Sequence, residues 1–250
     1  TQKLAYKYSD VITVISEDMK MKVMEQGVDE SKIHPIPNWF DDQSVHEVDW
    51  IDNRFVKKYD LSSDKFYVQY AGTMGYVFDY KMVINVAEKL KKYRDIEFHM
   101  IGQGSQKDLF MSEANKKGLD NIKFFPLEPQ HMVSDVYSAC SICFIPLKRG
   151  IIGNSVPSKA GLLMACNRTI VNSVDENSDY YRIFNDNEIG ISASNNDPDE
   201  VVKAIVSLYE DKDKRDSLAQ NGHKFGEKYF SRSVNTKKFI NTFHQMIGEN

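Results

Sequence analysis

The fold class of this chain is decided by residues 66–104, whose sequence is FYVQYAGTMGYVFDYKMVINVAEKLKKYRDIEFHMIGQG. Residues 66–71 are a short run rich in β-forming residues. Asp79 can cap a following helix, and the apolar residues that share one face of this helix are Val83, Val86, Ala87 and Leu90. Residues 96–101 form a second strand that ends in a glycine-rich triplet. A strand, a helix and a strand at this spacing predict a parallel βαβ unit.

The same alternation continues over most of the chain. Further strands are predicted at 122–125, 142–145 and 169–171. Ser105 is predicted to cap one intervening helix and Pro157 to occupy the first position (N1) of another. Asp197 and Pro198 form the N-cap and N1 pair of a later helix. The predicted fold class is therefore α/β, a doubly wound parallel sheet of the Rossmann type.

The two ends of the chain differ from this pattern. Residues 1–45 contain a strand over 11–15 and a helix over 17–26, whereas residues 212–250 are charged helices without a strand. We therefore divide the chain into three segments, 1–45, 46–230 and 231–250.

The composition is that of a protein with a sizeable apolar core. Of its 250 residues, 41% are hydrophobic and 27% are charged. The net charge of −4 argues against nucleic acid as a partner, because phosphate binding needs a basic stripe. Apolar runs reach about five residues where a membrane span needs about 20, and a signal peptide is not recognisable. Three cysteines indicate a reducing, cytoplasmic compartment.

Glycines gather where the predicted strands end, which is the edge at which doubly wound sheets bind ligands. The glycines of these loops are Gly72, Gly75, Gly102, Gly104, Gly150 and Gly153. Glycine lets a phosphate approach the main chain closely, and the helix N-termini that follow add partial positive charge. Strand-to-helix turns also need glycine without any ligand, and the sequence lacks a complete GxGxxG and a Walker loop. Phosphate binding and ordinary turns both stay open at this point.

The loop 148–159 carries the largest group of candidate ligand contacts. Its polar and turn-forming residues are Lys148, Arg149, Asn154, Ser155, Pro157, Ser158 and Lys159, with Val156 between them. With Pro157 at N1, the backbone N–H groups of Ser158 and Lys159 would point toward a diphosphate. A solvated surface loop is the alternative interpretation.

Other kinds of site have little support in the sequence. Cys140 and Cys143 form a CxxC pair, but a second pair at metal-site spacing is lacking, so we expect core packing. The six histidines never approach HxxxH spacing, so we expect no metal site. A GxSxG nucleophile elbow is also lacking. The carboxylates of Asp175, Glu176 and Asp179 are interpreted as a solvated helix N-terminus.

Seven motifs follow one another along the chain. They are SDVITVIS at 9–16, KIHPIPNWFD at 32–41, YAGTMG at 70–75, IGQG at 101–104, NIKFF at 121–125, VPSK at 156–159 and the tail from Arg215 through the FS pair at 230–231. In order and spacing they resemble the C-terminal, donor-binding part of family 4 glycosyltransferases, which have the two-domain GT-B fold. The VPSK motif is similar to a bacterial capsule and O-antigen branch that includes fucosamine transferases.

The resemblance gives each segment an expected role. Residues 1–45 would be the last strand, the last helix and the hinge of an N-terminal acceptor domain, and residues 46–230 a Rossmann-like domain for a nucleotide-sugar donor. Residues 231–250 would be a helix that crosses back toward the N-terminal domain. Most of that domain would be missing, so we expect the catalytic groups outside this chain and inefficient sugar transfer by the chain alone.

The resemblance also assigns individual positions. Thr73 falls where the family has its diphosphate-binding Arg, with Lys81 as the nearest candidate for the Lys partner. Asn154 and Leu162 fall where the family has two glutamates. The backbone of residues 125–128 would hold the nucleobase. The predicted donor-binding residues are Gly72, Thr73, Gly75, Lys81, Gly102, Gly104, Phe125, Leu127, Glu128, Lys148, Arg149, Asn154, Ser155, Val156, Pro157, Ser158 and Lys159.

The function implied by the resemblance is a retaining glycosyltransferase that uses a nucleotide-sugar, preferably UDP-linked, and a glycan or lipid-linked acceptor in capsule or O-antigen assembly. Helix N-termini and cations would stabilise the leaving nucleoside diphosphate without a metal or cofactor. A cytoplasmic location is implied, with contact to the inner face of the membrane through the missing domain. Two alternatives stay open: a UDP-sugar 2-epimerase on the same scaffold, and a non-catalytic nucleotide-binding domain, which the residues at Thr73 and Leu162 favour.

Overall fold

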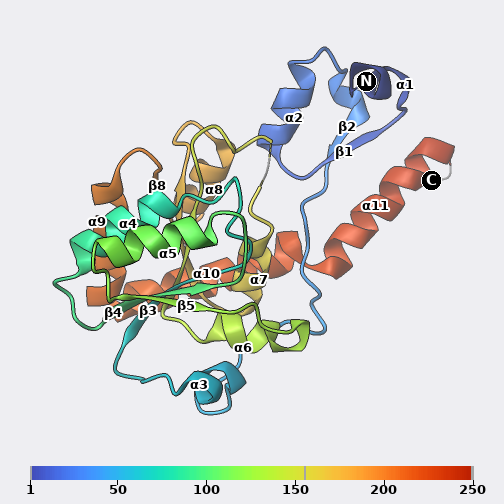
Figure 1. Cartoon of the computed structure of the whole chain (residues 1–250). Coiled ribbons are helices and arrows are strands. Elements are labelled where there is room, and N and C mark those ends of the chain that lie inside the picture. Colours follow the sequence, from blue (N-terminus) through green and yellow to red (C-terminus); the bar gives the residue numbers. More distant parts are fainter. Residues whose placement is uncertain (1, 155, 249–250) are drawn as a thin grey trace.

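Six parallel strands form the central sheet of the structure, a computed structural model that describes residues 2–154 and 156–248 (Figure 1). In chain order the strands are β3 (Phe66–Ala71), β4 (Ile96–Ile101), β5 (Ile122–Phe125), β6 (Ile142–Pro146), β7 (Thr169–Val174) and β8 (Ile191–Ser194). Their order in the sheet is β5-β4-β3-β6-β7-β8. The chain therefore winds outward from β3 in one direction, returns, and winds outward from β6 in the other. This topology confirms the predicted doubly wound sheet, and its switch point lies between β3 and β6.

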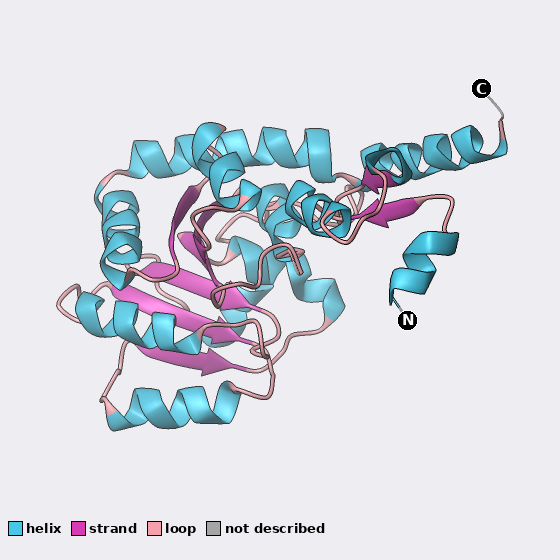
Figure 2. Cartoon of the chain, turned by 90° about the horizontal axis from the view of Figure 1, so that it is seen from above, coloured by secondary structure: helices cyan, strands magenta, loops and turns pink. Residues whose placement is uncertain are grey.

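Helices cover both faces of the sheet, as Figure 2 shows. One face packs against α4 (Tyr80–Leu90), α5 (Lys107–Lys116) and α9 (Pro198–Glu210). The other packs against α3 (Arg54–Tyr59), α6 (Val133–Ser138), α7 (Lys159–Ala165), α8 (Asp179–Asp186) and the later part of α10 (Lys212–Phe230). Alternate residues of β3 supply the two cores: Phe66, Val68 and Tyr70 face the first, and Tyr67 and Ala71 the second.

Two predicted helix starts are confirmed and two are wrong. The carboxylate of Asp79 accepts a hydrogen bond from the N–H of Met82, and that of Asp197 caps α9. Ser105 does not cap α5, because its neighbour Gln106 is held at the N-cap by a backbone hydrogen bond to the carbonyl of Met74. Pro157 is not at N1, because the N-cap of α7 is Ser158. The N–H of Ala160 donates to the carbonyl of Pro157 and closes a turn at the start of the helix.

The N-terminal segment forms a separate small layer. It consists of α1 (Gln2–Tyr8), β1 (Ile12–Val14), α2 (Glu17–Met24), the 3-10 turn η1 (Glu30–Lys32) and β2 (Ile33–Pro35). Strands β1 and β2 pair in parallel, and Val14, Val23 and Ile33 make a small core of their own. In Figures 1 and 2 the helix α11 (Arg232–Ile247) extends toward the side on which this layer lies.

Residues 36–53 form the linker between β2 and α3, and this linker meets the junction of α10 and α11. The N–H of Phe40 donates to the carbonyl of Phe230, and the N–H of Arg232 donates to the carbonyl of Phe40, both at 3.0 Å. The ring of Trp39 lies edge-on to that of Phe239, with centroids 5.6 Å apart. The linker is therefore anchored before it enters the large domain.

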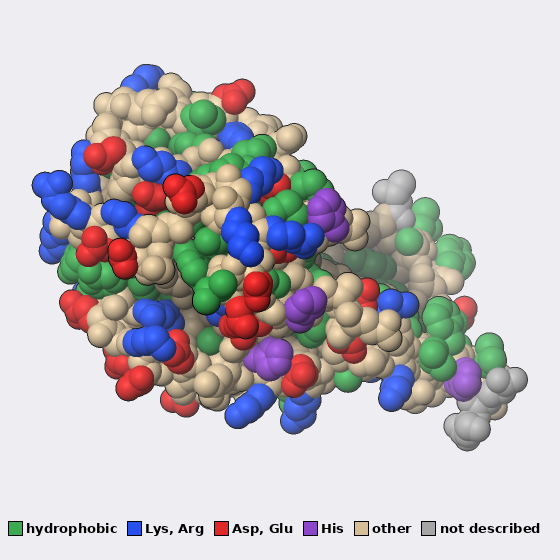
Figure 3. All heavy atoms as spheres, turned by 90° about the horizontal axis from the view of Figure 1, so that it is seen from below, with side chains coloured by type: hydrophobic (Ala, Val, Ile, Leu, Met, Phe, Trp, Pro, Cys, Tyr) green, Lys and Arg blue, Asp and Glu red, His purple; other side chains and the backbone are tan. Residues whose placement is uncertain are grey.

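The outer surface is mixed in character. Figure 3 shows acidic and basic side chains interspersed over one face, which is hollowed toward the end that holds α11. Across residues 2–154 and 156–248, each helix is too short or too polar to cross a lipid bilayer.

We predict that Gly102→Ala destabilises the protein by about 2 kcal/mol or more. Gly102 has φ +131°, and a Cβ atom there would lie 2.1 Å from the carbonyl oxygen of Gly72, so the backbones of two strand ends would have to separate. Gly150→Ala is the matched control: its φ is also positive, +74°, but nothing lies within 4 Å of the added Cβ, and we expect a cost of about 1 kcal/mol. Urea unfolding of both variants measures the difference, and equal costs would contradict the role of the close approach.

Candidate functional site

A lysine lies over the glycine that ends the central strand. Lys159 is the first residue of α7, and Gly72 directly follows β3. A Cβ atom at Gly72 would lie 1.9 Å from Cε of Lys159 and 2.6 Å from its Nζ. The ammonium of Lys159 also lies 5.1 Å from the ring centroid of Tyr70. The absence of a side chain at Gly72 therefore makes room for a cation at the ligand-binding edge of the sheet.

The charge of Lys159 is poorly compensated by the protein. Burial lowers the pKa of Lys159 from its ordinary value. Among the residues that the structure describes, no carboxylate oxygen lies within 4.0 Å of its ammonium. The ring of Tyr70 is the close neighbour of the Lys159 ammonium. Burial raises the pKa of Tyr70, and its hydroxyl donates to the carbonyl of Thr73 at 2.7 Å. Tyr70 thus stays neutral, and an anionic ligand would supply the missing counter-charge.

The loops after β3 and β4 are fastened to each other beside this lysine. The N–H of Met74 donates to the carbonyl of Gln103 at 2.8 Å, and a Cβ atom at Gly104 would lie 2.4 Å from the carbonyl oxygen of Met74. The structure thus brings together Gly72, Thr73, Gly102 and Gly104 of the predicted set. The main chain of residues 72–75 and 102–104 forms one packed rim, which Lys159 contacts at Gly72.

A second cation is attached to the same rim. The side-chain N–H of Gln106 donates to the carbonyl of Gly75, and the carbonyl oxygen of that side chain accepts a hydrogen bond from Nζ of Lys148 at 3.1 Å. Nζ of Lys148 also lies 5.3 Å from the ring centroid of Tyr76. Lys148 and Gly75 are therefore linked through Gln106, a residue that the sequence did not single out.

The segment after β5 borders a small cavity next to Gly72. This cavity has a volume of about 70 Å³, and its lining includes Gly72, Ile101, Glu128, Val136 and Tyr137. Leu127 also lines it, although 61% of its surface is exposed. Residues 127–129 thus line a cavity that lies next to Gly72.

The side chains of Glu128 and Phe125 point away from this cavity toward α3. The carboxylate of Glu128 is 3% exposed and accepts hydrogen bonds from Lys58 at 2.8 Å and from the hydroxyl of Tyr59 at 2.5 Å. Burial alone would raise the pKa of Glu128, but these two hydrogen bonds outweigh burial and hold it below its usual value. The ring of Phe125 packs against the rings of Phe55, Tyr59 and His99. Both side chains therefore position the loop.

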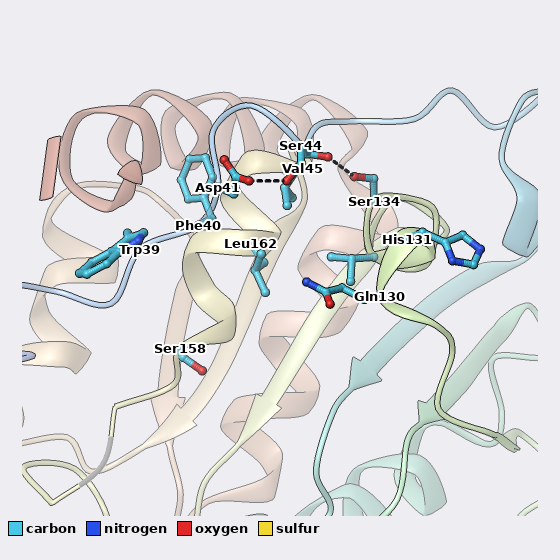
Figure 4. Close-up of a pocket in the computed structure, with 11 residues that line it drawn as sticks. Trp39, Phe40, Asp41, Ser44, Val45, Gln130, His131, Ser134, Ser158 and Leu162 are labelled. Atoms are coloured by element: carbon cyan, nitrogen blue, oxygen red, sulfur yellow. Dashed lines mark hydrogen bonds between the residues drawn. The ribbon is translucent and has the colours of Figure 1, made fainter. Parts of the chain in front are cut away.

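A larger cavity of about 950 Å³ opens between the linker, α7 and the 3-10 turn η2 (Gln130–Met132). Figure 4 shows Leu162 pointing from α7 toward Gln130, with Ser158 lower on the same side. The linker contributes Asp41 and Ser44, which are joined by a hydrogen bond of 2.9 Å.

The lining of this larger cavity was largely missed by sequence reasoning. The missed residues are Trp39, Phe40, Asp41, Ser44, Val45, Gln130, His131, Val133 and Ser134. The only available signal was the KIHPIPNWFD motif, which contains the first three of them.

Several predicted residues lie apart from the lysine. Arg149 lines a cavity with Asp18 and Lys22 of α2, and Asn154 lines another with residues of α1 and β1, so both face the N-terminal layer. Lys81 is exposed in the first turn of α4. Val156 packs at the edge of the second core, and Pro157 is half-buried beside it. Ser155 lies outside the described residues.

The weaker candidates are placed as follows. Cys140 and Cys143 are buried in the second core, as predicted. The interpretation of the carboxylates 175–179 as solvated is wrong for Asp175, which accepts the N–H of Gly150 at 3.0 Å and fastens the loop 148–154. No group of three or more His, Cys, Asp or Glu residues in the described part of the chain is arranged to hold a metal ion.

Together, these features define the class of the protein: a Rossmann-type α/β domain with a cation and two cavities at the carboxyl edge of its sheet. The family described as "Glycosyl transferases group 1" matches residues 52–225, and the chain belongs to this family. The family match confirms the resemblance drawn from the seven motifs.

Two bacterial glycosyltransferases are similar in sequence. The chain is 25% identical over 205 residues to a probable glycosyltransferase of Pseudomonas aeruginosa, WbjE, an alignment that covers 82% of this chain and 51% of WbjE. It is 28% identical over 161 residues to a putative colanic acid biosynthesis glycosyl transferase of Escherichia coli K12, WcaI, covering 62% of this chain and 38% of WcaI. The chain thus spans about half of WbjE and less of WcaI.

Solved structures share the fold. A structure of HepE from Anabaena in complex with UDP-glucose superposes with a TM-score of 0.83 at 14% identity, covering 97% of this chain and 65% of HepE. The sucrose-phosphate synthase of Thermosynechococcus elongatus gives a TM-score of 0.80 at 18% identity, covering 99% of this chain and 61% of the synthase. The chain has the fold of the C-terminal part of GT-B glycosyltransferases.

We predict that Glu128→Gln lowers the free energy of unfolding by about 1 kcal/mol at neutral pH, because Lys58 loses its ionic partner. The pKa of Glu128 is lowered in the folded state, so its contribution is present at neutral pH and is lost as the pH falls through that lowered pKa. The gap between the variant and the parent should therefore close in acid. Glu210→Gln, at the exposed end of α9, is the control, and urea unfolding at a series of pH values is the measurement. A gap that is independent of pH would contradict the ionic account.

Proposed function

We propose that this chain is the donor-binding part of a glycosyltransferase that takes a nucleotide-sugar, UDP-linked, and acts in the assembly of a bacterial surface polysaccharide. The observation that carries the proposal is the half-buried ammonium of Lys159 over Gly72 at the carboxyl edge of the sheet, without a carboxylate partner in the described structure. A nucleoside diphosphate brings the negative charge that this position needs.

The diphosphate is proposed to lie along residues 72–75, the part of the rim that follows β3. Lys159 would contact it directly, and Lys148 would approach from the other side through its attachment to Gln106 and Gly75. Lys159 then supplies the charge for which the family uses an Arg at the position of Thr73. Fixed donors of this kind stabilise the charge that develops on a leaving diphosphate.

The nucleobase is proposed to enter the cavity of about 70 Å³ beside Gly72, against the backbone of residues 127–129. A small cavity favours a single-ring base, which supports uracil over guanine. The complexes of HepE with UDP and with UDP-glucose support the same choice through the shared fold.

The ribose and the sugar are proposed to occupy the cavity of about 950 Å³. Leu162 has no polar atom for a ribose diol, so Ser158, Gln130 and Ser134, which line the same cavity, are the candidate contacts. Transfer with retention at the sugar would need the acceptor to reach the same face of the donor. We propose that a longer protein containing an acceptor domain performs this step, at the cytoplasmic face of the inner membrane, on a glycan or lipid-linked acceptor.

Calorimetric titration of the chain with UDP, GDP and dTDP tests the proposed donor site. We expect UDP to bind most tightly, and Lys159→Ala to weaken UDP binding by about 10- to 100-fold, the loss expected for one hydrogen bond to a charged group. Lys203→Ala, an exposed lysine of α9, is the matched control and should bind as the parent does. Equal UDP affinity in the parent and in Lys159→Ala would overturn the proposal.

The pH dependence of the same titration gives a second prediction. Only the protonated amine attracts a diphosphate, and burial lowers the pKa of Lys159. UDP affinity should therefore fall as the pH rises through that lowered pKa. Lys159→Arg keeps its charge over the same range and should lose this dependence. If the parent and the Arg variant weaken in parallel, the titrating group is not Lys159.

A full-length protein separates the proposed reaction from its two alternatives. Sugar transfer from UDP-sugar to a glycan supports the glycosyltransferase. Formation of a 2-epimer without transfer would assign the epimerase, and nucleotide binding without either product would assign the non-catalytic domain.

A further inference from the structure

A second polar cavity lies at the opposite edge of the central sheet. It has a volume of about 190 Å³ and is lined by the residues that precede β6 and β7, among them Ser138 and Arg168, together with Arg215 of α10. Trp50 forms part of its wall and stacks on Tyr67 at the start of β3. Because the strands are parallel, this amino-terminal edge is separated from the Lys159 site by the length of the strands.

Both arginines of this cavity have donor capacity that the protein does not use. Arg168 donates from Nε to the carbonyl of Ser138 and from Nη1 to the carbonyl of Asn167 and to the carboxylate of Glu47. Arg215 donates from Nη1 to the carbonyl of Leu208. A guanidinium has five N–H groups. Within residues 2–154 and 156–248, Nη2 of both arginines and Nε of Arg215 have no protein acceptor.

The charges around the cavity leave an excess of cations. Glu47 is paired with Arg168, and Asp216, which also lines the cavity, is paired with Lys212. The three cations Arg168, Arg215 and Lys212 thus outnumber the two carboxylates by one. Burial lowers the pKa of Arg215, Asp216 raises it in part, and the nearby charge of Arg168 lowers it further. The two guanidinium groups are therefore close enough to repel each other, and an anion between them would relieve that repulsion.

We propose that this cavity binds a phosphate group, held between Arg168 and Arg215 against the ring of Trp50. A phosphate offers several acceptor oxygens and up to two negative charges, which match the unused N–H groups of two guanidinium groups. The volume accommodates inorganic phosphate or the phosphate of a small ester. The site is separate from the proposed donor site and does not rest on the proposed function.

The two tryptophans of the chain allow the two sites to be observed separately. Trp39 lines the large cavity near α7 and Trp50 lines the arginine cavity, so Trp39→Phe leaves Trp50 as the single reporter. Sodium phosphate titrated into this variant, with sodium chloride holding the ionic strength constant, should change the Trp50 fluorescence saturably. Adding Lys159→Ala should leave that response unchanged, because Lys159 belongs to the other edge.

Arginine variants identify the binding groups. Arg215→Gln should weaken the phosphate response about tenfold or more, whereas Arg182→Gln, an exposed arginine of α8, should leave it unchanged. Arg168→Gln should also weaken it. Because Arg168 also holds Glu47, its variant can lose stability for a second reason. Thermal unfolding of the chain with both tryptophans gives a second readout: phosphate should raise the Tm of the parent clearly more than that of Arg215→Gln.

Two results would overturn the phosphate site. They are a Trp50 response that does not saturate, and a response of equal affinity in the parent and in Arg215→Gln. Glycerol phosphate in a parallel titration separates the sources of the phosphate: tighter binding than inorganic phosphate assigns an ester ligand, and equal or weaker binding assigns the free ion.

Discussion

The ends of β3 and β4 approach so closely that a Cβ atom at Gly102 would lie 2.1 Å from the carbonyl oxygen of Gly72. The absence of side chains at both positions brings the ends of β3 and β4 together and leaves space beside Gly72 that Lys159 enters from α7. The loops that follow are then joined by Met74 and Gln103, and Gln106 fastens Lys148 to the same rim. The geometry of the candidate site thus depends on one backbone contact that no other residue type permits without strain.

The position of Lys159 over Gly72 affects the stability of the protein. Lys159 is half-buried beside a neutral Tyr70, so its ammonium costs stability that a ligand-free protein does not recover. The folded-state pKa of Lys159 is lowered, so this cost is present below that pKa and diminishes as the pH rises through it. Binding residues commonly destabilise the unliganded protein, because function and stability oppose each other at such sites. A cation that lacks a protein counter-charge and would be stabilised by an anionic ligand fits this pattern.

The sequence was sufficient for the fold because its signals were local. The run 66–71, the helical spacing that follows Asp79 and the glycines after each strand all act within a few residues of each other. The site depends on distant partners: Glu128 points to Lys58, which is 70 residues away, and Arg149 and Asn154 face α1, β1 and α2. Pro157 was placed at N1 because the turn that delays α7 has no distinct sequence signal. Residues of the linker and η2 were missed because their cavity exists only after three separate elements have packed.

The central claim is that the half-buried ammonium of Lys159 has a nucleoside diphosphate as its partner. Its most direct test is an NMR titration of the Lys159 side chain against pH, assigned by comparison with Lys159→Ala, without UDP and with saturating UDP. The account predicts a pKa below the ordinary lysine value in the free chain and a clear rise when UDP is bound, because the diphosphate stabilises the charged form. An ordinary pKa in the free chain, or one that UDP does not move, would contradict it.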